Sequence, residues 1–183
     1  LRHSTTTTNT EGTTAGDKVE VNLADATGTA DAVELTVVSD LNTGTTYNYQ
    51  LAASGVESVT VNDKDSETNR LTLNNVSSHK TALNLTGGTA STDYTVLGTV
   101  IAKSVDASTQ ASNLRIDVGT ADQTIKLGTG NDILTFATVN GFNGSDTITD
   151  AGGTDTVRAS FNASVTGAPS LTGIEKFHIV TTA

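Results

Sequence analysis

The feature that most constrains this chain is a series of short segments in which apolar and polar residues alternate. They include KVEVNL, AVELTVV, VESVTVN, RLTLNNV, TIKL, ILTF and FHIV, four to seven residues each, and Gly, Asn, Asp, Ser or Thr bounds them. Side chains of a β-strand point alternately to opposite faces, so a period of two predicts half-buried strands. The best helical candidate, TASTDYTVLGTVIAKSV, is interrupted by Gly98 and rich in β-branched residues. The predicted class is therefore all-β.

Composition narrows the possible functions. The chain holds 20 acidic and 10 basic residues, for a net charge of −10. This balance argues against nucleic acid and against anionic membrane surfaces, which both need clustered Lys and Arg. No apolar run approaches the ~20 residues of a membrane span, so membrane insertion is not expected. The absence of Cys excludes disulfides and thiolate metal sites, and the acidic charge is compatible with divalent cations and secretion.

Internal repeats favour a solenoid over a β-sandwich. GVESVTV (Gly55 to Val61) and GIEKFHI (Gly173 to Ile179) share a Gly, a Glu and three apolar positions. In the C-terminal third, Ile125 and Leu134 are nine residues apart, and so are Ile148 and Val157. A fixed spacing of apolar residues is typical of stacked structural repeats.

A short motif accompanies this spacing. The fragments GNDIL, GSDTI and GTDTV all read Gly-x-Asp-x-apolar, and GTADQTI is a looser fourth copy. Calcium binds six to eight oxygen ligands, and a short loop supplies that many only by turning main-chain carbonyls inward, which the positive φ values of glycine permit. A dinucleotide or phosphate loop would need a following helix or a Lys, and neither is present. A plain turn without metal remains the alternative.

The most complete unit, GTGNDILTF, resembles the nonapeptide Gly-Gly-x-Gly-x-Asp-x-U-x of RTX proteins, although only one of its first two glycines is present. Together with GTADAVELTV, GVESVTV and LTGIEKFHI, it resembles bacterial surface-layer (S-layer) proteins of the RTX type and related secreted calcium-binding proteins. The resemblance implies a Ca²⁺-stabilised parallel β-solenoid, or β-roll, type I secretion and self-assembly into a lattice on the bacterial cell surface.

The motif and the resemblance together give a set of candidate calcium ligands. In a β-roll two nonapeptides form one coil of about 18 residues. With an insertion near 137–141, Asp132 is expected to share an edge with Asp155, and Asp122 with Asp146. The predicted ligands are the carboxylates of Asp132, Asp146 and Asp155, with Asp122 and Asp150 as further candidates, and main-chain oxygens near Gly128, Gly130, Gly144 and Gly153.

The chain is predicted to have three parts. Residues 1–17 form a polar, Thr-rich linker or frayed terminus. Residues 18–115 form a β-rich domain, either solenoid or sandwich, and residues 116–183 form the RTX-like β-roll. The acidic run NDKDSETN, with Asp63, Asp65 and Glu67, is either a solvated turn or a second type of calcium site.

No catalytic constellation is present, so no enzymatic activity is expected. The three His residues have no H-E-x-x-H spacing, and no G-x-S-x-G motif occurs. Besides the surface-layer hypothesis, two others stay open. One is an adhesin or glycan-binding module that contacts cell-surface polysaccharide, and the other is the noncatalytic C-terminal part of a secreted protease or lipase.

Overall fold

The computed structural model describes residues 3–4, 17–22, 28–38, 46–64, 66–73, 81–90, 92–136 and 138–181. These residues contain strands and turns and no helix. Of the predicted linker at 1–17, only His3, Ser4 and Asp17 are among them, and all three lie in strands. The rest of that segment, together with Asp65 of the acidic run, lies outside the described residues.

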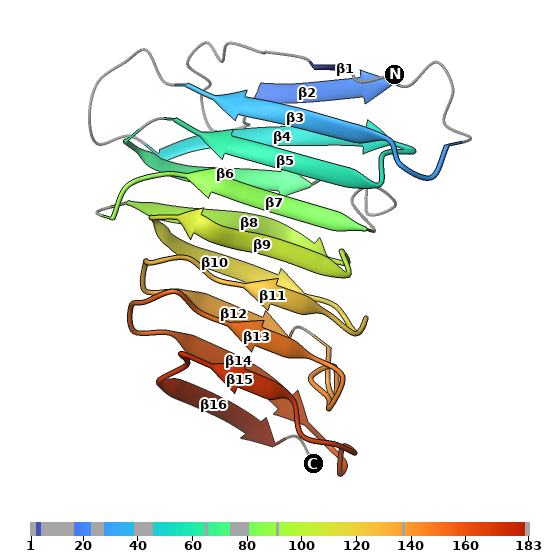
Figure 1. The fold of residues 1–183 in the computed structure, drawn as a ribbon, viewed down its shortest axis with the longest axis vertical. Coiled ribbons are helices and arrows are strands. Elements are labelled where there is room, and N and C mark those ends of the chain that lie inside the picture. The colour runs from blue at the N-terminus through green and yellow to red at the C-terminus, as the bar shows by residue number, and fades with distance from the viewer. Residues whose placement is uncertain are drawn as a thin grey trace.

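The chain winds into a solenoid with two parallel sheets, and each turn gives one strand to each sheet (Figure 1). We call the sheets odd and even after their strand numbers. The odd sheet contains β1 (His3–Ser4), β3 (Ala32–Val37), β5 (Ser58–Asp63), β7 (Ala82–Gly87), β9 (Ser104–Gln110), β11 (Thr124–Lys126), β13 (Thr147–Thr149) and β15 (Ser170–Thr172). The even sheet contains β2 (Asp17–Asn22), β4 (Thr46–Ser54), β6 (Thr68–Leu73), β8 (Asp93–Val100), β10 (Asn113–Val118), β12 (Ile133–Phe136), β14 (Thr156–Phe161) and β16 (Lys176–Thr181).

The predicted parallel β-solenoid is confirmed. Strands of the N-terminal half pair in parallel within the same two sheets, so this half does not form an antiparallel sandwich. Strand β10 crosses the predicted boundary between residues 115 and 116, and it pairs with β8 on one side and β12 on the other.

Alternation places one apolar column from each sheet in the interior. Val59, Leu83, Val105, Ile125 and Ile148 are stacked in register in the odd sheet and are fully buried. The even sheet contributes a matching column of Leu71, Val96, Ile116, Leu134 and Val157. Burying each such side chain stabilises the fold by about 1.5–3 kcal/mol. The nine-residue spacing therefore reflects two core residues facing each other across one turn.

Both apolar columns continue into the last coil, where their side chains are exposed. Leu171 continues the odd column and Phe177 the even column, but these side chains are 38% and 42% exposed. Ile179, on the same strand as Phe177, is 53% exposed. The core pattern thus extends to β15 and β16, where nothing among the described residues covers it.

Two irregularities interrupt the ladders near the middle. In the even sheet, Ile116 pairs with Val96 but Asp117 pairs with Thr99, so Leu97 and Gly98 form a bulge in β8. Gly98 takes a φ of 94°, which glycine adopts without strain. The odd sheet has a comparable shift between β7 and β9.

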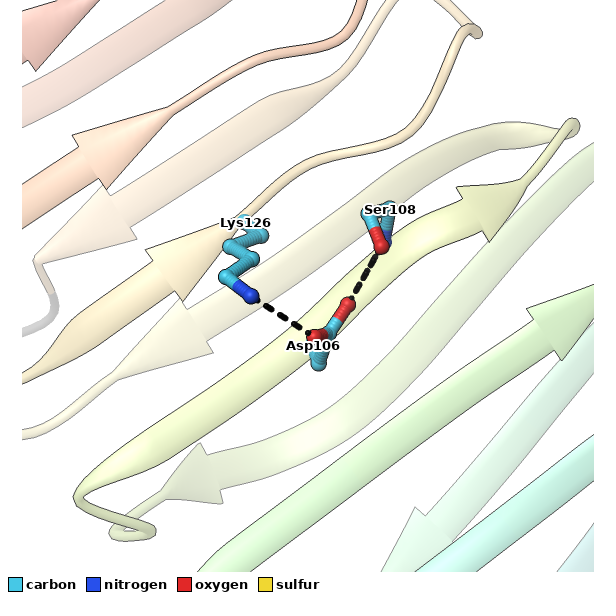
Figure 2. Close-up of polar contacts among 3 residues, drawn as sticks. All are labelled: Asp106, Ser108 and Lys126. Carbon is cyan, nitrogen blue, oxygen red and sulfur yellow. Dashed lines mark hydrogen bonds and ion pairs between the residues drawn. The ribbon is translucent and has the colours of Figure 1, made fainter.

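On the outer face of the odd sheet, Asp106 lies between two partners (Figure 2). Its carboxylate is 3.2 Å from Lys126 Nζ on the next odd strand, and it accepts hydrogen bonds from the hydroxyl and the main-chain N–H of Ser108. These bonds and the Lys126 charge lower the pKa of Asp106. This exposed acid gives a comparison for the buried acids at the edges.

Candidate metal centre

The two edges of the solenoid consist of the turns between strands. We call them the odd-to-even edge, where an odd strand connects to the following even strand, and the even-to-odd edge. The six-residue turns 127–132 and 150–155 lie at the odd-to-even edge. The turns 119–123 and, within the described residues, 138–146 lie at the opposite edge.

The acid of GNDIL, GSDTI and GTDTV forms the same contact in each copy, and a Glu forms it at two further turns. In each case the residue precedes a strand, and its carboxylate accepts a hydrogen bond from a main-chain N–H of the preceding coil. The bonds are Asp31 N to Glu57 Oε2 (2.9 Å), Leu114 N to Asp132 Oδ1 (2.8 Å), Gln123 N to Asp146 Oδ1 (3.0 Å), Asp132 N to Asp155 Oδ1 (2.7 Å) and Asp155 N to Glu175 Oε2 (2.8 Å). Buried main-chain donors at a turn need such acceptors, and a charged acceptor makes the stronger bond.

Two of these acids also close their own turns. Asp132 Oδ2 accepts a bond from Gly128 N at 3.1 Å, and Asp146 Oδ2 accepts one from Asn143 N at 2.8 Å. Both carboxylates therefore satisfy main-chain donors with both oxygens. These hydrogen bonds give the motif a structural role even without bound calcium.

The expected register is confirmed at one edge and differs by one residue at the other. Asp132 and Asp155 are stacked, because Ile133 pairs with Thr156. At the even-to-odd edge Thr124 pairs with Thr147, so the residue opposite Asp146 is Gln123 and not Asp122. Asp122 is exposed, and its charge adds to the burial that raises the pKa of Asp146.

The predicted glycines divide between the edges, and the close approach of neighbouring coils explains why three of them are glycine. Gly128, Gly130 and Gly153 lie in the two turns of the odd-to-even edge, and Gly144 lies at the other. Only Gly153 has a positive φ, 135°. A Cβ on Gly128 would lie 1.9 Å from the Gln110 carbonyl oxygen, and one on Gly130 would lie 2.3 Å from that of Ser112. A Cβ on Gly144 would likewise lie 2.6 Å from the Cα of Gly167. Stacked coils approach too closely there for any side chain.

Three carboxylates meet at the odd-to-even edge. Asp132, Asp150 and Asp155 each place an oxygen within 4.8 Å of the others. Asp132 is 1% exposed and Asp155 is 0% exposed. Within the described part of the chain, Asp155 Oδ2 and Asp150 Oδ1 are buried and lack a hydrogen-bond partner. Gly153, between the two Asp residues of its turn, brings the Gly130 carbonyl oxygen close to the same place.

The electrostatics of this cluster disfavour three free charges. Burial raises the pKa of Asp132 to about 6. Burial and the charges of Asp150 and Asp132 raise the pKa of Asp155 to about 7. The pKa of Asp150 is also raised, first by burial and then by the charge of Glu175. Near neutral pH the cluster is neutralised either by protons or by a cation.

The sequence prediction did not include two acids with the same role, Glu57 and Glu175. The sequence could have indicated them, because both are the Glu of the repeated phrase Gly-[Val/Ile]-Glu. In the structure this Glu takes the place of the Asp of the Gly-x-Asp motif.

The acidic run NDKDSETN differs from a solvated turn, which was one of the two interpretations of this segment. Asp63 is 2% exposed and Glu67 is 8% exposed, and Asp63 accepts a bond from Asn69 Nδ2 at 3.0 Å.

Within the described residues, these features define a β-solenoid with a buried cluster of three carboxylates at its odd-to-even edge. Comparison with known proteins gives no match to a family model, a curated protein or a solved structure. The described residues include no helix that is long and apolar enough to cross a membrane.

Proposed function

We propose that this chain is a calcium-binding structural segment of a secreted bacterial surface protein of the S-layer type. The observation that carries the proposal is the Asp155 carboxylate. It is fully buried beside two other carboxylates, and among the described residues only the neighbouring Asp150 carboxyl, when protonated, can donate a hydrogen bond to its remaining oxygen. An unpaired buried charge is costly, and a cation removes that cost.

The donor set favours calcium among the common cations. Asp132, Asp150 and Asp155 offer only oxygen, and no His or Cys takes part. Hard oxygen ligands suit Ca²⁺ or Mg²⁺, and Ca²⁺ accepts the larger number of ligands and the less regular geometry. The Gly130 carbonyl oxygen, which lies against Gly153 beside Asp155, is a main-chain candidate. A carboxylate oxygen that accepts one N–H bond retains a second lone pair, so the Asp132 contacts do not exclude ligation.

Bound calcium would connect successive coils. Asp132 belongs to the turn before β12, whereas Asp150 and Asp155 belong to the turn before β14. A cation held by both turns would replace the repulsion between stacked carboxylates with attraction. Its effect would be greatest on the stacking of these coils, which suits a protein that becomes rigid only outside the cell.

Self-association is the second part of the proposal. Leu171, Phe177 and Ile179 have exposed apolar side chains on β15 and β16, and either a further coil or a second copy of the chain would cover them. The net charge of −10 opposes contact between copies, and divalent cations would reduce that repulsion. No nucleic-acid or membrane partner is proposed.

The test is a calcium titration followed by calorimetry, circular dichroism and light scattering. We expect calcium to bind, to raise the melting temperature and to start assembly. Asp155→Ala should abolish the binding heat, and Asp106→Ala, which removes an exposed acid of the odd sheet, should not. Full strand content in chelator without binding heat would refute the calcium site, and binding without assembly would refute the surface-layer role alone.

A further inference from the structure

The outer face of the even sheet contains a shallow groove over β8, β10, β12 and β14, strands that lie side by side in the middle and lower part of Figure 1. Its volume is about 200 Å³. The walls include the side chains of Arg115 and Arg158, and the floor lies over Ile133 and Thr135 between them. The groove is on a sheet face and is distinct from the acidic cluster at the edge.

The β8 bulge borders one side of this groove. Because Leu97 and Gly98 have no partners on β10, the strand departs from the regular ladder at this point. Leu97 is 42% exposed and lines the groove, as does Thr95 on the same strand. A bulge bends its strand and increases the local twist, and the groove lies directly beside it.

Positive charge gathers on this face of an acidic protein. Arg115 and Arg158 are both exposed, and no ion pair or hydrogen bond engages either guanidinium within the described part of the chain. Arg70 lies on the same face, two strands from Arg115. With only 10 basic residues in the chain, two unpaired arginines on one groove make an anion-binding feature that the fold itself does not need.

The spacing of the arginines limits the size of a ligand. Arg115 is in register with Ile133 and Thr156, and Arg158 is two residues further along β14. Two strand spacings of about 4.8 Å and two residues of about 3.3 Å separate their Cα atoms by about 11–12 Å. Long side chains can reach a common ligand of one to three small rings across this distance.

We propose that the groove binds a short acidic saccharide, with its carboxylates on Arg115 and Arg158. The guanidinium fork matches a carboxylate with two parallel hydrogen bonds. The sugar hydroxyls find acceptors in the exposed Asp117 and donors or acceptors in Thr95 and Thr135, which all line the groove. The apolar C–H face of a sugar ring fits against Leu97 and Ile133.

The lining favours a saccharide over an acidic peptide. Asp117 would repel an acidic peptide, whereas it accepts hydrogen bonds from the hydroxyls that a uronate carries beside its carboxylate. The groove lies on the face of four paired strands, so it offers no free main-chain edge for a peptide to extend the sheet. This assignment does not depend on the calcium-binding proposal.

The experiment is an NMR titration of the ¹⁵N-labelled full chain with a galacturonate trisaccharide, at one fixed free calcium concentration. A neutral galactose trisaccharide, acetate and a poly-Asp peptide serve as comparison ligands. We expect shifts at Thr95, Arg115, Thr135 and Arg158 with the acidic trisaccharide. Arg115→Ala and Arg158→Ala should each weaken binding by about tenfold, the loss typical of a hydrogen bond to a charged group.

Arg70→Ala is the matched control, because it removes the same charge from the same face outside the groove. It should change the affinity less than twofold, an effect of roughly 0.4 kcal/mol. Arg115→Lys keeps the charge but not the fork, and it should bind more weakly than the wild type. Circular dichroism of each variant establishes that the fold is retained.

Four results would overturn the proposal. The first is equal binding of the neutral trisaccharide, and the second is equal binding of acetate or the poly-Asp peptide, which would reduce the groove to a general anion or peptide site. The third is a set of shifts outside β8, β10, β12 and β14. An equal loss of affinity in Arg70→Ala would show that net charge alone accounts for binding.

Discussion

Replacing Asp155 by Asn should stabilise the fold in chelator and should remove most of the stabilisation that calcium provides. The amide keeps an oxygen that can accept the Asp132 N–H bond of 2.7 Å, but it removes a charge from a fully buried position. In chelator at about pH 8 the variant should therefore be more stable than the wild type. In about 10 mM calcium this advantage should largely disappear, because the amide is a poorer ligand and the wild type gains more from the ion.

The magnitude follows from the pKa of Asp155. Burial raises it from 3.8 to about 7, so the neutral form is favoured in the folded state. The stability that the neutral carboxyl provides is complete below pH 3.8 and is lost as the pH rises through about 7. A shift of about three units corresponds to about 4 kcal/mol. Asp150 shares the ionisation, and an amide accepts a weaker hydrogen bond, so we expect a gain of about 2–3 kcal/mol.

Urea unfolding followed by circular dichroism measures this difference. With a dissociation constant of about 10⁻⁴–10⁻³ M, about 10 mM calcium should stabilise the wild type by about 1.4–2.7 kcal/mol per site. Asp155→Asn should gain little. The control is Asp106→Asn, which loses the exposed ion pair with Lys126 (Figure 2) and should change stability by less than about 1 kcal/mol in either buffer.

One result would refute this reasoning. If Asp155→Asn is destabilised equally in chelator and in calcium, the carboxylate acts only as a hydrogen-bond acceptor for the preceding coil. The cluster would then be a structural feature of the solenoid, and the ion would have to bind elsewhere or not at all.

Three further predictions follow from the same edge. In chelator, the free energy of unfolding of the wild type should fall between about pH 4 and pH 8 in urea titrations. The reason is that Asp132 and Asp155 have raised pKa values of about 6 and 7 and lose their protons over this range. Saturating calcium should make the free energy of unfolding less dependent on pH. Gly130→Ala should cost about 1–3 kcal/mol in the same assay, since its Cβ would lie 2.3 Å from a carbonyl oxygen of the neighbouring coil, whereas the exposed Thr129→Ala should be nearly neutral. Glu175→Ala should cost about 1 kcal/mol and speed amide exchange at Asp155, and Glu175→Gln should do neither; equal exchange in the two variants would contradict the assigned bond.

Much of the fold could be predicted because its repeats are visible over short stretches of sequence. Alternation identifies the strands, and the nine-residue spacing of Ile125 and Leu134 reflects opposite walls of one turn. The coil from Ile116 to Leu134 is 18 residues long, as the resemblance implied. Other coils differ; from Val21 to Ala53 the step is 32 residues, because turns absorb insertions that the strand pattern does not record.

The candidate site could be predicted only in part. Asp132 and Asp155 share an edge as expected, but the cluster is completed by Asp150, which was a weaker candidate, and not by Asp146. Sequence shows which residues precede a strand, and both acids do. It does not show how the turn before β14 folds, so it could not show that Asp150 brings its carboxylate against the other two.

The unequal coils have a consequence for the dimensions of the molecule. Every coil advances the stack by one strand spacing of about 4.8 Å, whether it contains 18 residues or 32. Each eight-stranded sheet therefore spans about 33 Å along the axis, and only the number of coils sets that length. An insertion in a turn thickens the molecule sideways and leaves its axial repeat unchanged. A protein built in this way can vary the turns on its outer surface freely while the spacing of its coils along the axis stays constant.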